Sequence, residues 1–73
     1  MQTSWSKERV QALKRQAYAH REDEVVEELL VKMNLHLNNH ERATLIHTKN
    51  EEWKEVETIA AEMNQRLLSL QVP

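Results

Sequence analysis

The chain contains no cysteine and no glycine, and its one proline is the last residue, Pro73. Without cysteine it can form no disulfide, and cysteine usage says nothing about the redox compartment. Glycine and proline are the usual residues of tight turns, and a sheet protein of this length needs several such turns. Phenylalanine is also absent, so two tryptophans and one tyrosine supply all the aromatic side chains. These absences favour helices over a sheet.

Long apolar runs and a strong net charge are also missing. The longest strictly aliphatic run is Leu29-Leu30-Val31, far shorter than a membrane span. The amino-terminal residues lack the continuous apolar segment of a signal peptide, so we expect a cytoplasmic protein. The net charge of −2 is small and does not favour a general nucleic-acid binder.

What the chain does contain is typical of helices. Leucine, glutamate, lysine, arginine, glutamine and alanine are abundant, and these residues lose little side-chain entropy in a helix. We therefore predict an all-α fold in a single domain, residues 1–73. A chain of this size is near the lower limit for burying a sufficient core alone, so we expect another subunit to add stability.

Two apolar stripes in the first half face different directions. Ser6 is a suitable N-cap, and the residues after it form one narrow stripe: Val10, Leu13 and Ala17. The apolar set between Val25 and Leu37 is centred about 150° away from that stripe on a helical wheel. We prefer one long helix whose first turns have their own neighbour. The alternative is a break near residues 20–24, with Asp23 as a new N-cap, which would give three helices.

Asn38-Asn39 is the best candidate for a turn, because asparagine tolerates the backbone angles of a helix end. Residues 40–49 could be helix or loop, and helix is the preferred interpretation. Thr48 and Glu51 have the spacing of a capping box, so the last helix could restart there. Ile46 lies seven residues before Trp53 and would extend the apolar seam of that helix.

The predicted architecture is an antiparallel hairpin of two long helices that completes a helical bundle by dimerisation. Val31 and Leu35 lie on the far side of the first helix, so two helices alone leave apolar surface uncovered. The predicted core or dimer seam has heptad-like spacing on both helices. It comprises Val26, Leu30, Met33, Leu37, Trp53, Val56, Ala60, Met63, Leu67 and Leu70.

Histidines and carboxylates are the candidate chemical groups. His36, His40 and His47 have spacings that could bring imidazoles together around a transition metal. A helix break at Asn38-Asn39 would separate the first two, so we predict no metal and no cofactor. His20 precedes Glu24 by four residues, a spacing typical of surface pairs. No nucleophile or pocket accompanies that pair, and we do not expect an enzyme.

The first segment is the predicted partner-binding element, because aromatic residues and arginine are enriched at binding hot spots. Its candidate residues are Trp5, Arg9, Val10, Leu13, Lys14, Tyr18 and Arg21. We expect a small protein–protein interaction module that docks a helix face on another protein, as an adaptor, small chaperone or antagonist. The alternative is a nucleic-acid-binding regulator that uses the basic 7–21 segment. A histidine metal site is the third hypothesis.

Overall fold

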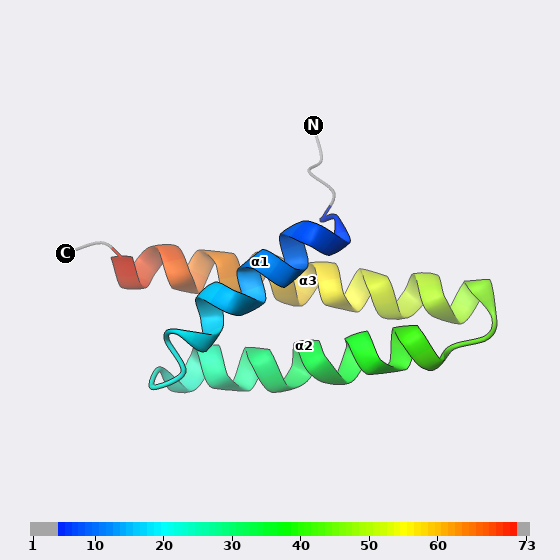
Figure 1. The fold of residues 1–73 in the computed structure, drawn as a ribbon, viewed down its shortest axis with the longest axis horizontal. Helices are drawn as coiled ribbons and strands as arrows, with labels where there is room; N and C mark the ends of the chain where they lie inside the picture. The colour runs from blue at the N-terminus through cyan, green and yellow to red at the C-terminus, as the bar shows by residue number, and fades with distance from the viewer. Residues whose placement is uncertain (1–4, 72–73) are drawn as a thin grey trace.

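A computed structural model describes residues 5–71, which form three α-helices and no strand. Helix α1 spans Lys7–Tyr18, α2 spans Glu24–Arg42 and α3 spans Ile46–Gln71. Helices α2 and α3 form an antiparallel hairpin, and α1 lies across one face of it (Figure 1). The end of the hairpin that carries the α2–α3 turn extends beyond α1.

Polar side chains mark where the first two helices begin. The Oγ of Ser6 accepts a hydrogen bond from the Arg9 N–H at 3.2 Å, so Ser6 is the N-cap of α1. The Oδ1 of Asp23 accepts the Val26 N–H at 3.1 Å in the same way at the start of α2. Both helices therefore start at residues that satisfy the unpaired amides of a first turn.

The core lies between the three helices and is entirely apolar among the described residues. Each helix contributes one stripe at helical spacing, and burial of each large side chain is worth about 1.5–3 kcal/mol. The buried side chains are Val10, Leu13, Ala17, Val26, Leu29, Leu30, Met33, Val56, Ile59, Ala60, Met63 and Leu67. Trp5, Leu37 and Trp53 pack against this cluster and are partly buried.

The single long first helix that the sequence favoured is wrong, and its alternative is confirmed. The chain leaves α1 at Tyr18, turns over residues 19–23 and restarts with Asp23 as the N-cap of α2. This turn explains the 150° offset between the two apolar stripes. Because α1 folds back across the hairpin, both stripes face the same core.

The predicted turn at Asn38-Asn39 is also wrong. Both asparagines lie within α2, and the chain reverses at residues 43–45 instead. Asparagine costs only about 0.7 kcal/mol in a helix interior. Contacts across the hairpin offset that cost: the Asn39 side-chain amide donates to Glu52 Oε1 at 3.4 Å. Residues 40–42 and 46–49 are helical, as preferred, but the alternative restart with Thr48 as N-cap is wrong by three residues, since α3 begins at Ile46.

Most of the predicted seam lies inside the molecule. Leu37 and Trp53 are partly buried, Leu70 is exposed, and the other seven members are buried. Val31 and Leu35 remain exposed on α2, as their position on the far side of that helix predicted. Within residues 5–71, no helix combines the length and the apolar character that crossing a bilayer requires.

Candidate functional site

The α2–α3 turn is closed by two reciprocal hydrogen bonds. His40 Nδ1 lies 3.0 Å from the Lys49 carbonyl oxygen, and Lys49 Nζ donates to the His40 carbonyl oxygen at 2.9 Å. The lysine thus satisfies one of the unpaired carbonyls at the end of α2 and places a positive charge at the negative end of the helix dipole. The two helix ends are held together on both sides of the short connection.

This arrangement fixes the proton on the His40 ring. A carbonyl oxygen can only accept, so Nδ1 of His40 must carry the hydrogen that is directed at Lys49. The other ring nitrogen, Nε2, is then an acceptor when the ring is neutral. The His40 ring also lies against Trp53, with ring centroids 5.3 Å apart and the planes tilted by 48°. The imidazole of His40 therefore packs against the indole of Trp53.

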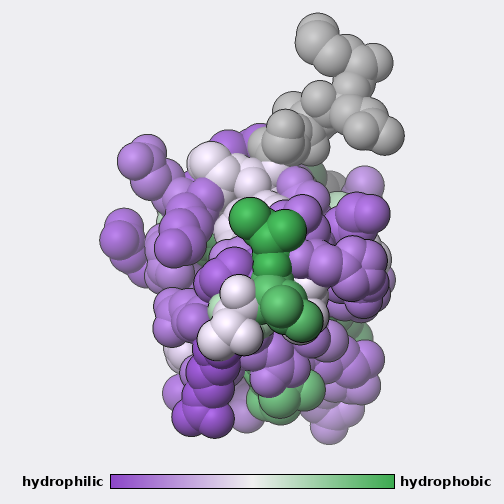
Figure 2. Space-filling view, turned by 90° about the vertical axis from the view of Figure 1, so that its right-hand side faces the viewer, coloured by the Kyte–Doolittle hydropathy of each residue, from purple (hydrophilic) through white to green (hydrophobic). Residues whose placement is uncertain are grey.

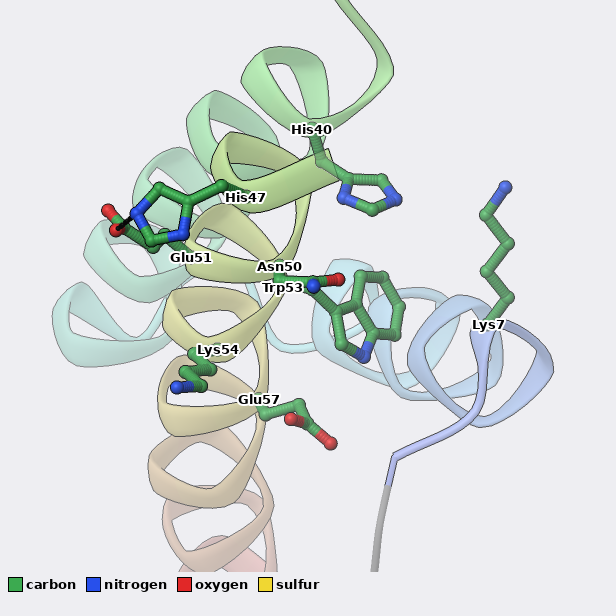
Figure 3. A pocket seen from close by; sticks show the side chains of 8 residues that line it. All are labelled: Lys7, His40, His47, Asn50, Glu51, Trp53, Lys54 and Glu57. Atoms are coloured by element: carbon green, nitrogen blue, oxygen red, sulfur yellow. Dashed lines mark ion pairs between the residues drawn. The ribbon is translucent and has the colours of Figure 1, made fainter. Parts of the chain in front are cut away.

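A cavity of about 670 Å³ opens beside Trp53. Figure 3 shows the indole at its centre, with His40 from α2 above it and Lys7 from α1 on the opposite wall. The walls thus come from all three helices. Glu57 lines the lower end, where its Oε2 accepts the backbone N–H of Trp5 at 3.1 Å and ties the start of α1 to α3.

Two exposed apolar residues, Leu45 and Ile46, lie between this cavity and the end of the hairpin. Ile46, Asn50, Trp53 and Glu57 are spaced by four, three and four residues, so they follow one side of α3. Ile46 is 78% exposed, and the preceding Leu45 is 67% exposed. Figure 2 looks onto this end and shows apolar side chains at its centre, surrounded by polar ones. We call Leu45, Ile46, Trp53, His40 and Lys7 the tip surface.

The residue at the N-cap position of α3, Leu45, has no side-chain oxygen, unlike the N-cap residues of α1 and α2. It is the residue immediately before α3, and its carbonyl oxygen accepts the Lys49 N–H at 3.0 Å, so it holds the N-cap position. Ser6 and Asp23 cap their helices with side-chain oxygens. Leucine cannot do this and is among the poorest N-cap residues. The chain thus gives up capping energy here and exposes an apolar side chain.

The predicted partner-binding residues do not form one surface. Val10 and Leu13 are buried in the core, because the turn at residues 19–23 brings the α1 stripe onto the hairpin. Trp5 is half-buried against that core, with the Arg9 guanidinium 4.3 Å from its ring centroid. Val10 and Leu13 therefore cannot contact a partner while this fold is intact, and that part of the prediction is wrong.

Two cations of the basic 7–21 segment, Lys14 and Arg21, have neighbours within the chain. Arg21 forms an ion pair with Glu27 at 3.6 Å, and its guanidinium lies 5.8 Å from the ring of the exposed Tyr18. Lys14 is half-buried and lines a hollow together with Glu41. Several cations on one open face are needed to hold a nucleic-acid backbone. The ion pair of Arg21 and the partial burial of Lys14 reduce the number of fully open cations on this segment.

The four histidines are each engaged separately. His36 Nδ1 lies 2.6 Å from Glu52 Oε2 across the hairpin, and His47 Nε2 lies 2.6 Å from Glu51 Oε1 on the exposed side of α3. His47 and Glu51 line the edge of the same cavity as Trp53, and Figure 3 shows their ion pair. The nearest carboxylate of His20 is Glu22 at 4.0 Å, not the predicted Glu24. No group of three metal-binding side chains occurs among residues 5–71.

Leu45 was not among the predicted site residues, and Ile46 was expected only to extend the seam of the last helix if that helix were continuous. In the sequence, Thr44 directly before Leu45 resembles an N-cap, so only the observed start of α3 at Ile46 shows that Leu45 holds the cap position. The resulting site offers an apolar rim, a half-buried indole and charges of both signs, which suits the binding of a side chain. Comparison with protein-family models, curated protein sequences and solved structures finds no match to this chain.

Proposed function

We propose that this protein is a non-enzymatic interaction module that binds a helix of another protein at its tip surface. Binding would be stoichiometric, and its effect on the partner would be steric, as in an adaptor, a small chaperone or an antagonist of a larger protein. The observation that carries the proposal is the exposed Leu45 at an N-cap position, followed directly by the exposed Ile46. Positions that break a local stability rule are expected to be functional ones.

The shape of the tip surface supports a helical partner. Leu45 and Ile46 form an exposed apolar rim, and the half-buried Trp53 forms the floor of the neighbouring cavity. An amphipathic helix with apolar residues three and four apart could place one side chain over the rim and the next against the indole. Lys7 and Glu57 on the cavity walls would orient this helix through its polar flank.

We also propose that the module associates with itself, as the need for added stability in a small chain suggests. Val31 and Leu35 support this, because they remain exposed outside the core and away from the tip surface. A single domain of this size gains stability from any subunit that binds only the folded chain.

The test is a comparison of matched variants in affinity capture from extracts of the native host. Leu45→Asp and Ile46→Glu remove the apolar rim, and both add an acidic side chain where a helix start tolerates it. Leu68→Glu is the control, since Leu68 is also an exposed apolar residue but lies near the far end of α3. We expect one protein to be captured by the wild type and by the Leu68 variant and lost with both tip variants.

Two results would contradict the proposal. One is capture that is equally strong with the tip variants, once circular dichroism has shown that they are folded. The other is binding of duplex DNA that is tighter than micromolar at physiological salt and falls steeply as salt rises, which would favour the nucleic-acid alternative. The same titration on Lys14→Ala and Arg15→Ala would then locate the contact on α1.

A further inference from the structure

The outward face of α2 carries a second regular seam. Six residues are separated by steps of four, three, four, three and four, and all of them are exposed. At 100° per residue they fall within an arc of about 80° and extend over about 27 Å. They are Glu24, Glu28, Val31, Leu35, Asn38 and Arg42. This spacing is the one that packs two helices side by side in a coiled coil.

The charge of the side chains changes along this outer seam from one end of α2 to the other. Val31 and Leu35 at its centre are 63% and 55% exposed. Glu24 and Glu28 lie towards the start of the helix, and Arg42 is its last residue. The seam thus has an apolar middle, an acidic beginning and a basic end.

We propose that the outer seam of α2 binds the same seam of a second copy in antiparallel orientation, about a two-fold axis near Met33. Val31 then packs on the partner's Leu35, and Glu24 faces the partner's Arg42. Asn38 lies opposite the partner's Glu28, which its amide can reach as a donor. Each contact occurs twice because a two-fold interface is self-complementary. The inference rests on the proposed self-association and names the surface that carries it.

Charge selects the antiparallel orientation over the parallel one. In a parallel pair, Glu24 and Glu28 would face the same glutamates of the second copy, and Arg42 would face Arg42. Like charges opposite one another destabilise a helix pair, whereas the antiparallel register replaces these contacts with pairs of opposite sign. A parallel pair would also align the two helix dipoles in the same direction.

The outer seam fits a second copy because each half of it complements the other half. Tyr18, 47% exposed, lines a hollow with Val31 and adds an aromatic border to the apolar centre. One helix pair of this length covers less than the roughly 1,600 Å² of a standard interface. We therefore expect a reversible dimer with a dissociation constant of the order of tens to hundreds of micromolar.

Sedimentation velocity over a wide concentration range measures this association directly. The wild-type mass should rise from 8.7 kDa towards twice that value as the concentration passes about 100 μM. A variant that combines Val31→Glu and Leu35→Glu should remain at 8.7 kDa throughout. Leu68→Glu is the matched control and should dimerise like the wild type, because Leu68 lies on α3 and outside the outer seam.

A charge exchange tests the register. In the dimer, position 24 of each copy faces position 42 of the other. Glu24→Arg alone therefore opposes two arginines at each end, and Arg42→Glu alone opposes two glutamates at each end. Each single variant should weaken dimerisation about tenfold, and the double variant should recover most of that loss. Recovery is specific to the antiparallel register, since the exchange leaves like charges opposed in a parallel pair.

The results separate this inference from the wider proposals. A wild-type protein that stays monomeric at millimolar concentration would overturn both the outer seam and self-association. A dimer that survives the Val31 and Leu35 substitutions would overturn the outer seam alone. A dimer that is lost with Leu45→Asp would move the contact to the tip surface and overturn the outer seam as well. Circular dichroism of each variant keeps loss of folding distinct from loss of association.

Discussion

The carboxylate of Asp23 and the guanidinium of Arg66 join the start of α2 to the last part of α3. Arg66 Nε donates to Oδ1 at 3.2 Å, and Nη2 donates to Oδ2 at 2.7 Å. Oδ1 also accepts the Val26 N–H, so the same carboxylate caps α2. The hydrogen bonds from Arg66, followed by the one from Val26, lower the pKa of Asp23 below its ordinary value of 3.8. One side chain therefore fixes both a helix start and the hairpin.

This pair makes stability depend on pH in the acid range. A carboxyl group whose pKa is lower in the folded state stabilises the fold fully above its unfolded pKa, and the contribution disappears as pH falls through the folded pKa. Asp23→Asn retains a good N-cap but loses the ionic pair. The variant should melt at a lower temperature than the wild type at pH 7, and the difference in melting temperature should narrow as pH falls below about 4 and through the lowered pKa of Asp23.

Thermal denaturation of both proteins from neutral to acid pH measures that gap. Arg66→Gln provides the matching control, because it removes the partner and leaves the Asp23 cap in place. It should show the same convergence with the wild type. A difference that is constant across the whole pH range would show that the pair contributes nothing through the charge of Asp23.

Two histidine–glutamate pairs of equal length should differ in strength. His36 and Glu52 pair across the hairpin at 2.6 Å and are mostly covered, whereas His47 and Glu51 pair at 2.6 Å along α3 and are exposed. Exposed pairs are screened by water and are worth about 0.3–0.5 kcal/mol. We expect a coupling energy of about 1 kcal/mol for the first pair and less than half of that for the second.

Double-mutant cycles with alanine at each position measure these coupling energies by denaturant unfolding. The comparison is internal, since each pair is the control for the other. Equal coupling energies would mean that coverage of the inter-helix pair adds nothing to its strength.

Leu13 tests whether α1 belongs to the core or to a partner-binding face. It is buried between α1 and the hairpin, so Leu13→Ala should destabilise the fold by about 2–4 kcal/mol. Leu68→Ala removes the same atoms from an exposed position and should change stability by less than about 0.5 kcal/mol. Similar small effects at both positions would show that α1 does not pack on the hairpin in solution.

Amide hydrogen exchange should divide the molecule into two units. Helix α1 has twelve residues, and an isolated helix of that length is marginal in water. The longer α2 and α3 protect each other along the hairpin. Amides near Leu13 should therefore open at a free energy at least about 1 kcal/mol below that of amides near Met33 and Met63. Uniform protection would indicate a single cooperative unit.

Leu45→Asp should stabilise the protein while it removes the tip surface. Aspartate at an N-cap position accepts an amide of the first turn and favours the positive end of the helix dipole. We expect a gain of about 0.5–1.5 kcal/mol in the free energy of unfolding, measured by urea denaturation. Leu45→Ala is the control and should leave stability nearly unchanged. A loss of stability with aspartate would mean that Leu45 makes a structural contact.

Periodicity and composition predicted a large part of this fold. The absence of glycine and internal proline gave the all-helical class, and three-four spacing identified most of the residues that the core buries. Ser6 and Asp23 were readable as N-caps from residue type alone. The apolar stripe at Val10 was correctly seen to face a separate direction on the wheel. The pattern could not distinguish two arrangements. In one, a straight helix packs its first turns on a separate neighbour; in the other, the chain turns and both stripes face the same core.

The remaining errors concern contacts between residues distant in the sequence. Asn38-Asn39 resembles a helix end locally, but Glu52 and Lys49 stabilise α2 through and beyond it. The inclusion of Val10 and Leu13 in the partner-binding set was wrong for the same reason, because both are covered by a hairpin whose path depends on both turns. Leu45 was overlooked because an exposed leucine becomes informative only when the helix boundary beside it is known.

None of the residues from 5 to 71 adopts a positive φ angle, so both chain reversals use φ angles that residues other than glycine adopt without strain. Neither connection depends on the special freedom of glycine. Residues 43–45 can therefore change identity with little penalty to the backbone. Evolution, or an experimenter with a randomised library, can vary the surface at this end of the molecule while the helical scaffold behind it stays the same.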